Sequence, residues 1–168
     1  MTHFTSKKPK KALFLTIFSS ILVIIGFMTI SSCNKTEACK LTANYPKDVN
    51  SSQRAAMIAY CTTNNINYTI DSSGILYQII TPGSTTKVNL CESLSITYVG
   101  KLMNGAQFDA GTFSSPLSNL VPGWQIVVPY IGKGGRMKIL IPSSLAYGSQ
   151  ANGSIPANSP LYFDIILN

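Results

Sequence analysis

Residues 94–124, LSITYVGKLMNGAQFDAGTFSSPLSNLVPGW, decide the fold of this chain. The first part, Leu94–Leu102, alternates β-branched or aromatic residues with polar ones, which is typical of a strand. The last part begins a candidate helix that runs from Val121 to Ile131. Pro129 limits this helix to a short one, because proline lacks the N–H that a helix interior needs. The stretch therefore predicts a strand and one short helix.

Further strands are predicted on both sides of this stretch. Downstream, residues 136–141 and 161–167 show β-branched and aromatic alternation between segments rich in Gly, Pro and Asn. Upstream, residues 67–70 and 75–80 are rich in β-formers, and Asp71-Ser72-Ser73-Gly74 between them has the composition of a turn. The upstream pair therefore predicts a hairpin.

A short helix is expected before this hairpin. It would begin at Ser51, an N-cap type of residue, and end near the Asn64-Asn65 pair. The predicted fold class is α+β, a curved antiparallel β-sheet wrapped around one short helix, preceded by a short N-terminal helix and hairpin extension.

Five short motifs follow one another in the second half of the chain. They are Tyr98-Val99-Gly100, Gly105-Ala106-Gln107-Phe108-Asp109, Leu120-Val121-Pro122-Gly123-Trp124, Leu145-Ala146-Tyr147-Gly148, and Ile155-Pro156 with Leu161-Tyr162-Phe163-Asp164. In this order and spacing they resemble the FKBP-type peptidyl-prolyl cis/trans isomerases, over roughly residues 88–167. The helix and hairpin before them resemble the extension of bacterial lipoprotein members of that family, of the Bacteroidetes type.

The resemblance implies a hydrophobic pocket between the sheet and the short helix. Trp124 would be its floor, Tyr98, Phe108, Phe113, Leu120, Val121 and Phe163 its walls, and Asp109, Tyr147 and the backbone N–H of Ile155 its polar contacts. The Tyr147 hydroxyl would donate to a substrate carbonyl, and Asp109 would face the rotating carbonyl or orient its neighbours. Taken singly, each of these residues also suits an ordinary sheet core or loop.

The chemistry of this family fits a chain without a catalytic histidine. His3 is the only histidine, and it lies in a leader segment, so a His-based triad, a His general base and a His metal ligand are excluded for the mature chain. Isomerisation of an X-Pro bond needs no nucleophile, metal or proton relay, only a site that binds the twisted amide best. No cofactor and no metal are predicted.

The chain departs from the family pattern in two places. Ser115 stands where many members have a second aromatic residue, which is expected to widen or polarise the pocket rim. Residues 125–129, QIVVP, give the helix start an apolar rather than an acidic character, which weakens the favourable charge at that end. The polar segment 148–154 is expected to form a mobile loop over the pocket that influences substrate preference.

The N-terminal segment has the pattern of a targeting signal. Four lysines precede the run Ala12–Ile30, which has no charged residue, and Ile30-Ser31-Ser32-Cys33 resembles a bacterial lipobox that ends in the lipidated cysteine. An uncleaved membrane helix is the alternative, since the run approaches the roughly 20 residues that span a bilayer. The predicted organisation is a signal peptide at 1–32, a tether at 33–50, the extension at 51–87 and the isomerase domain at 88–168.

Three cysteines remain after Cys33 in what should be an oxidising compartment. They are Cys39, Cys61 and Cys91, so at most one disulfide forms within the chain. A bond between Cys39, in the tether, and Cys61, at the end of the short helix, is the favoured expectation.

The net charge and the expected location of the protein indicate which partners it should have. The formal charge of +7 falls to +3 without the four leader lysines, and the other basic residues are dispersed, so no nucleic-acid partner is expected. The expected partners are proline-containing unfolded or extended polypeptides, a membrane through the lipid at Cys33, and macrolide FKBP inhibitors. The expected location is the cell envelope, at the periplasmic face of the outer membrane. A non-catalytic chaperone and a structural envelope lipoprotein remain as alternatives.

Overall fold

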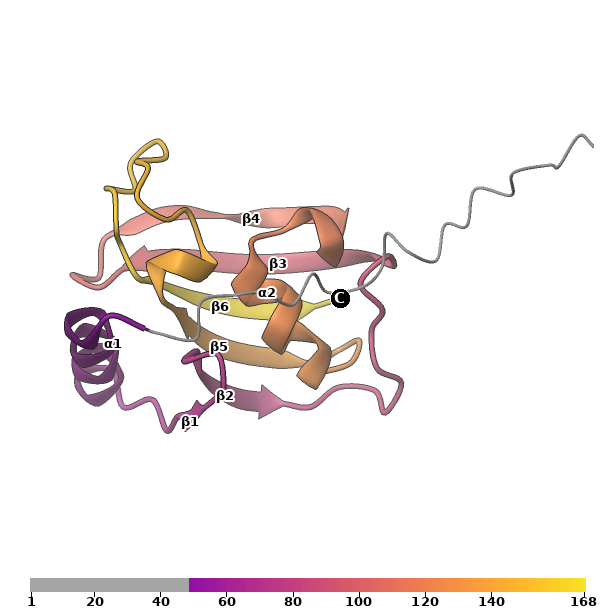
Figure 1. Cartoon of the computed structure of the whole chain (residues 1–168). Coiled ribbons are helices and arrows are strands. Elements are labelled where there is room, and N and C mark those ends of the chain that lie inside the picture. Colours follow the sequence, from indigo (N-terminus) through magenta and orange to yellow (C-terminus); the bar gives the residue numbers. More distant parts are fainter. Residues whose placement is uncertain (1–48) are drawn as a thin grey trace, which may run out of the picture. The chain divides into compact units, whose positions relative to one another are not determined.

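The computed structural model describes residues 49–168, which form one six-stranded sheet with two α-helices (Figure 1). The elements are α1 (Ser51–Thr63), β1 (Thr69–Ile70), β2 (Leu76–Thr81), β3 (Ser93–Leu102), β4 (Gln107–Pro116), α2 (Pro122–Val127), β5 (Arg136–Ile141) and β6 (Leu161–Leu167), with 3₁₀ turns η2 (Leu117–Asn119), η3 (Val128–Tyr130) and η4 (Ser143–Leu145). The strand order is β1-β2-β5-β6-β3-β4, and every neighbouring pair is antiparallel. The predicted α+β architecture with its N-terminal helix and hairpin is confirmed.

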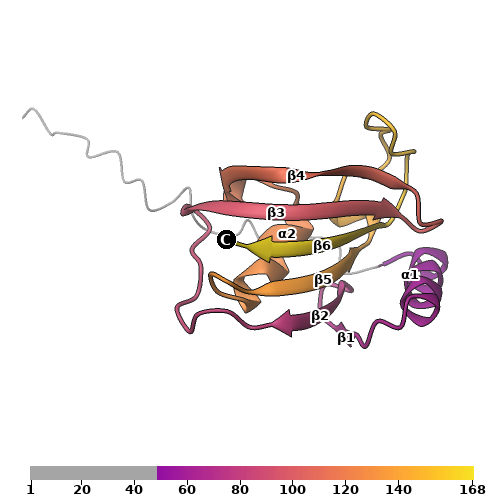
Figure 2. The same ribbon diagram turned by 180° about the vertical axis from the view of Figure 1, so that it is seen from behind.

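The short helix α2 lies across one face of the sheet, and Figure 2 shows the sheet from the opposite side. The main core fills the space between α2 and this face, with Trp124 and Val127 of α2 packed among residues of the central strands, such as Ile139, Phe163 and Ile165. Burial of these apolar side chains stabilises the fold by roughly 1.5–3 kcal/mol each. The main core therefore holds Trp124 in place.

A second, smaller core lies on the other face of the sheet. Met57, Tyr60 and Cys61 of α1 pack with Leu140 of β5 and Tyr162 of β6. Their neighbours Ile139, Ile141 and Phe163 belong to the main core, as expected where successive side chains of a strand point to opposite faces. The extension helix is thus packed on the same sheet that carries the pocket.

One strand was missed by sequence analysis. The strand β4 runs from Gln107 to Pro116 and pairs along its length with β3, yet its sequence QFDAGTFSSP contains few strongly β-forming residues. Most of its residues are exposed or half-buried, because β4 is the last strand of the sheet. Tertiary pairing rather than intrinsic propensity makes this segment a strand.

The short helix is shorter than predicted. It begins at Pro122, the favoured first position for proline, and ends at Val127 rather than Ile131. Pro129 lies in the 3₁₀ turn that follows. Because proline has no N–H to continue the α-helical ladder, the last turn tightens into this 3₁₀ geometry.

The expected pairing of Cys39 with Cys61 is wrong. Cys61 is a free thiol that is 1% exposed on the inner face of α1, against the second core. Burial raises the pKa of this thiol to about 11, so the reactive thiolate is scarce at neutral pH. Cys91 is disulfide-bonded. The leader, the lipidation site at Cys33 and nearly all of the tether lie outside the described residues.

Among residues 49–168, no helix combines the length and the apolar character that crossing a bilayer requires.

Candidate active site

Nearly all the predicted site residues meet in one cavity of about 100 Å³ between the sheet and α2. The cavity is lined by Tyr98 of β3, Phe108, Asp109 and Phe113 of β4, Leu120, Val121 and Trp124 around the start of α2, Tyr147 after η4, and Phe163 of β6. Ile155 is the one predicted residue outside this lining. Residues that lie up to 65 positions apart in sequence, from Tyr98 to Phe163, thus form one apolar site.

Trp124 lies at the bottom of the cavity and is 4% exposed. Its ring meets Phe163 edge to face at 5.1 Å and Tyr98 at 5.7 Å, measured between ring centroids. Phe108 packs edge to face on Phe163 at 5.6 Å. Such edge-to-face pairs contribute about 0.5–1.5 kcal/mol each beyond area burial, so they stabilise this arrangement of the aromatic floor. No described residue accepts a hydrogen bond from the buried Trp124 Nε1.

Two glycines allow this aromatic packing. A Cβ at Gly123 would lie 2.3 Å from a side-chain carbon of Ile141, so only glycine lets α2 approach β5 this closely. A Cβ at Gly100 would lie 2.5 Å from the Phe108 ring, so the glycine of β3 makes room for a wall of the pocket. These contacts give a physical reason for a glycine in two of the sequence motifs.

The carboxylate of Asp109 is engaged within the pocket. It accepts hydrogen bonds from the Tyr98 hydroxyl and from the N–H of Ala110. Burial, and then the hydrogen bond to Asp109, raise the pKa of Tyr98 to about 12, so its hydroxyl stays protonated and acts as a donor. The pair fixes the Tyr98 ring, which is packed edge to face on Phe113. Asp109 thus orients a neighbouring pocket side chain, one of the two roles predicted for it.

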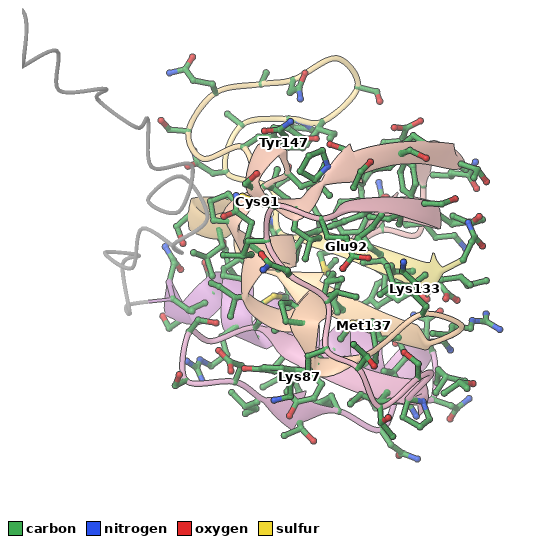
Figure 3. The ribbon with its side chains drawn as sticks, turned by 90° about the vertical axis from the view of Figure 1, so that its right-hand side faces the viewer. Lys87, Cys91, Glu92, Lys133, Met137 and Tyr147 are labelled. Carbon is green, nitrogen blue, oxygen red and sulfur yellow. The ribbon has the colours of Figure 1, made fainter. Side chains whose placement is uncertain are left out.

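Tyr147 differs from Tyr98 because its hydroxyl is available. Its side chain is 39% exposed, and the hydroxyl makes no hydrogen bond with any residue of the described part. Figure 3 shows Tyr147 below the loop that follows it, at one edge of the molecule. A hydroxyl that lines an apolar cavity and makes no hydrogen bond within the described part of the chain can donate to a ligand carbonyl.

Ile155 lies in the loop beside the pocket. It lines a neighbouring cavity of about 170 Å³ that shares Phe108, Asp109 and Tyr147 with the aromatic pocket. Its N–H, expected to contact substrate, donates to the carbonyl of Asn152 at 2.9 Å. Contact of this N–H with a substrate would therefore require that hydrogen bond to open or to be shared.

The two departures from the family pattern have local explanations. The Ser115 hydroxyl donates to the carbonyl of Pro116, and Ser115 is not among the residues that line the aromatic pocket. Gln125, in the apolar helix start, donates from Nε2 to the carbonyls of Leu120 at 2.7 Å and Ser118 at 3.3 Å. Sequence analysis missed this role of Gln125, which holds the segment that carries Leu120, because no local pattern indicates it.

Two other features of the described residues bear on function. A groove of about 440 Å³ lies between α1 and the turn after β3, lined by residues such as Ala59, Tyr60 and Met103, away from the aromatic cluster. Within residues 49–168, no group of His, Cys, Asp and Glu side chains is arranged to hold a metal ion. The aromatic pocket is the site that matches the predicted chemistry.

The sequence of this chain is similar to a known protein family and to several known proteins. The family described as "FKBP-type peptidyl-prolyl cis-trans isomerase" matches residues 84–168, which is half of the chain. The chain belongs to this family. FkpA of Buchnera aphidicola subsp. Acyrthosiphon pisum is 39% identical over 101 residues, which cover 57% of this chain and 42% of that protein. FkpA of Escherichia coli K12 is 37% identical over 101 residues, covering 57% of this chain and 37% of that protein.

Solved structures agree with the family assignment. The crystal structure of FkpA from Escherichia coli matches with a TM-score of 0.61 and 30% identity, over 70% of this chain and 58% of that one. A peptidyl-prolyl cis-trans isomerase from Pseudomonas syringae matches with a TM-score of 0.59 and 26% identity, over 73% of this chain and 96% of that one. The chain spans about two fifths of the curated relatives it matches, so the similarity concerns the FKBP domain.

Proposed function

We propose that this protein is a peptidyl-prolyl cis/trans isomerase that assists the folding of exported proteins. The observation that carries the proposal is the apolar pocket with the buried Trp124 at its floor and, at its rim, a Tyr147 hydroxyl that has no hydrogen-bond partner among residues 49–168. Membership of the FKBP-type family supports the same reaction. The substrates would be unfolded or extended polypeptides that contain proline.

The pocket would act by preferring the twisted amide. Rotation about a peptide bond meets a barrier of about 18–20 kcal/mol, because the planar form has partial double-bond character. Twisting removes this resonance and leaves a less polarised carbonyl and nitrogen, so a dry aromatic cavity binds the twisted form better than either planar form. Each 1.36 kcal/mol or so of this preference raises the rate about tenfold.

Polar groups at the rim would orient the substrate. The Tyr147 hydroxyl would donate to a carbonyl next to the proline, while Asp109 holds Tyr98 in place by accepting its hydroxyl hydrogen bond. The proline ring would lie on Trp124, in the cavity whose walls include Phe108 and Phe163. None of these groups needs to change its protonation state, so the reaction needs no general acid or base. Macrolide inhibitors of the FKBP class should occupy the same cavity.

A proline-limited refolding assay tests the isomerase. A chain beginning at Asn34 should accelerate both the refolding of a proline-limited client and the cis/trans exchange of short X-Pro peptides. A macrolide should abolish the acceleration and change the fluorescence of Trp124, the only tryptophan. A folded protein that accelerates neither reaction, but suppresses aggregation of a proline-free client, would show that the pocket holds chains without isomerising them.

We further propose that the protein is anchored in the cell envelope by lipid on Cys33, at the periplasmic face of the outer membrane. The proposal rests on the basic leader, the uncharged run and the lipobox-like end at Cys33. Each buried CH₂ of an acyl chain contributes about 0.8 kcal/mol, so several chains would hold the protein permanently. Cys33→Ala should accumulate as an unprocessed precursor without attached lipid, and normal maturation of this variant would contradict the proposal.

A further inference from the structure

One side chain of α1, Gln53, makes three hydrogen bonds to the β5–β6 loop, residues 142–160. Its Oε1 accepts from the N–H of Ser143 at 3.0 Å. Its Nε2 donates to Ser143 Oγ at 2.9 Å and to the carbonyl of Asn158 at 3.1 Å. Because only the amide oxygen can accept from an N–H, these partners define which way the amide group faces. A single side chain thus bridges the two ends of the loop.

The first of these ends lacks a local cap. Ser143 begins the 3₁₀ turn η4, and Pro142 before it supplies no side-chain hydrogen bond to that turn. The first N–H groups of a helical turn have no acceptor within the turn. Ser143 is also buried, at 6% exposure, so water is a poor substitute. Gln53 therefore supplies from another element the cap that Pro142 does not provide.

Backbone hydrogen bonds transmit this restraint to the pocket rim. The N–H of Gly148 donates to the carbonyl of Ser143 at 2.8 Å, and the N–H of Asn158 donates to the carbonyl of Gly148 at 2.9 Å. Tyr147 directly precedes Gly148 and lines the pocket. Holding Ser143 and Asn158 therefore holds the backbone from which Tyr147 projects.

The helix that carries Gln53 is itself fixed at this end of the sheet. It packs on Leu140, next to the last residue of β5, and on Tyr162, the second residue of β6. These are the strands that enter and leave the β5–β6 loop. Both ribbon views place α1 at the end of the sheet from which this loop emerges (Figure 1, Figure 2). The family match begins at residue 84, so α1 lies outside it.

We propose that Gln53 is a positioning residue of the isomerase site. By capping Ser143 and binding Asn158, it sets the position of the Tyr147 hydroxyl over the pocket, so the N-terminal extension tunes the activity of the FKBP domain. This inference rests on the proposed isomerase function. It assigns to α1 a role at the site in addition to its packing on the sheet.

The test compares variants of the full chain purified in mild detergent. Gln53→Leu keeps the size and helix propensity of the side chain but removes all three hydrogen bonds. Gln78→Leu is the matched control, because Gln78 is also half-buried, lies in the extension and makes no side-chain hydrogen bond within the described residues. At a temperature where both are folded, kcat/KM of Gln53→Leu should fall about three- to thirteenfold below the control, and no further than the loss expected when the Tyr147 hydroxyl is removed altogether. A value within about twofold of the control would overturn the proposal.

A double-mutant cycle separates positioning from general destabilisation. In a Tyr147→Phe background the hydroxyl is already absent, so Gln53→Leu should cause a clearly smaller further loss of kcat/KM than in the wild type. The same fold-loss in both backgrounds would show that Gln53 does not act through Tyr147. If Gln53→Leu does not fold, Gln53→Glu takes its place in the cycle. Its carboxylate can still accept from Ser143 but cannot donate to Asn158, and it is held to the same criterion.

Amide hydrogen exchange tests the restraint without using activity. Gln53→Leu should speed exchange at Gly148 and Asn158 while leaving residues of β3 and β6 unchanged. Uniformly faster exchange, or no change at these two amides, would overturn the proposed restraint. If the wild-type chain shows no isomerase activity, the proposed function fails, and the exchange data alone decide whether Gln53 holds the loop.

Discussion

Two tyrosines that line the pocket allow a matched test, because removing the hydroxyl should lower catalytic activity at one of them and stability at the other. Tyr147→Phe and Tyr98→Phe each remove one hydroxyl and keep the ring. The Tyr147 hydroxyl has no partner in the described part of the protein, whereas the Tyr98 hydroxyl donates to Asp109. The first change should therefore affect catalysis, and the second should affect stability.

The magnitudes follow from these contacts. A neutral hydrogen bond from Tyr147 to a substrate carbonyl is worth about 0.5–1.5 kcal/mol, so Tyr147→Phe should lower kcat/KM by roughly two- to thirteenfold. Its Tm should stay within about 1 °C of the wild type, because no intramolecular bond is lost. Hydrogen bonds to charged groups are worth about 1.5–3 kcal/mol, but Asp109 is exposed and keeps the Ala110 N–H. Tyr98→Phe should thus cost about 1–1.5 kcal/mol, a drop in Tm of roughly 4–6 °C.

The measurements are X-Pro peptide exchange for kcat/KM and thermal unfolding followed by circular dichroism for Tm. Both are made on chains beginning at Asn34, with rates normalised to folded protein. An unchanged kcat/KM in Tyr147→Phe would refute the proposed donor role. A drop in Tm for Tyr147→Phe as large as that for Tyr98→Phe would show that its hydroxyl has a partner within the protein.

Three further predictions concern packing, ionisation and thiols. Gly123→Ala brings a methyl within 2.3 Å of Ile141, and the overpacking of about 1–3 kcal/mol should outweigh the gain in helix propensity of about 1 kcal/mol, giving a lower urea midpoint. Burial and the Asp109 hydrogen bond raise the pKa of Tyr98 to about 12, so the contribution of this tyrosine to stability is complete below pH 10.0, its ordinary pKa, and is lost as pH rises through 12. Asp109→Asn should lower the pKa of Tyr98 in a tyrosinate absorbance titration, and an unchanged pKa would contradict the pairing. Cys61 should resist thiol reagents until the protein is denatured, and labelling of native Cys61 would contradict its burial. If Cys33 carries the proposed lipid, mass mapping should find Cys91 linked to Cys39, the one other cysteine.

The sequence predicts best where local pattern and tertiary environment agree. The strands β5 and β6 have the predicted bounds, 136–141 and 161–167, because their β-branched and aromatic residues match strands buried in the centre of the sheet. The edge strand β4 was not predicted, since Ala110, Gly111 and the serines near its end form a strand only through pairing with β3. The site motifs were recognisable because their order is shared with a family, not because any single residue indicates the chemistry.

Other features depend on distances that no local pattern contains. The wrong disulfide pairing came from the position of Cys61 near the end of a helix, but the side chain points to the inner face and is buried there. The role of Ile155 was inferred for its N–H, and the structure shows this N–H already bonded to Asn152. In both cases the position along the chain was known, and the direction in which the group points was not.

The helical position of Gln53 indicates that it faces the protein, but the sequence does not identify its hydrogen-bond partners. It lies four residues before Met57, and positions i and i+4 share one face of a helix, so Gln53 continues the stripe that α1 buries and is itself half-buried. A polar residue on a buried stripe needs a hydrogen-bond partner, because an unsatisfied buried amide costs about 1–3 kcal/mol. The sequence therefore favours a hydrogen-bond partner for Gln53 within the protein. Its partners are 90 and 105 residues away, and only the packing of α1 over the ends of β5 and β6 brings them within reach.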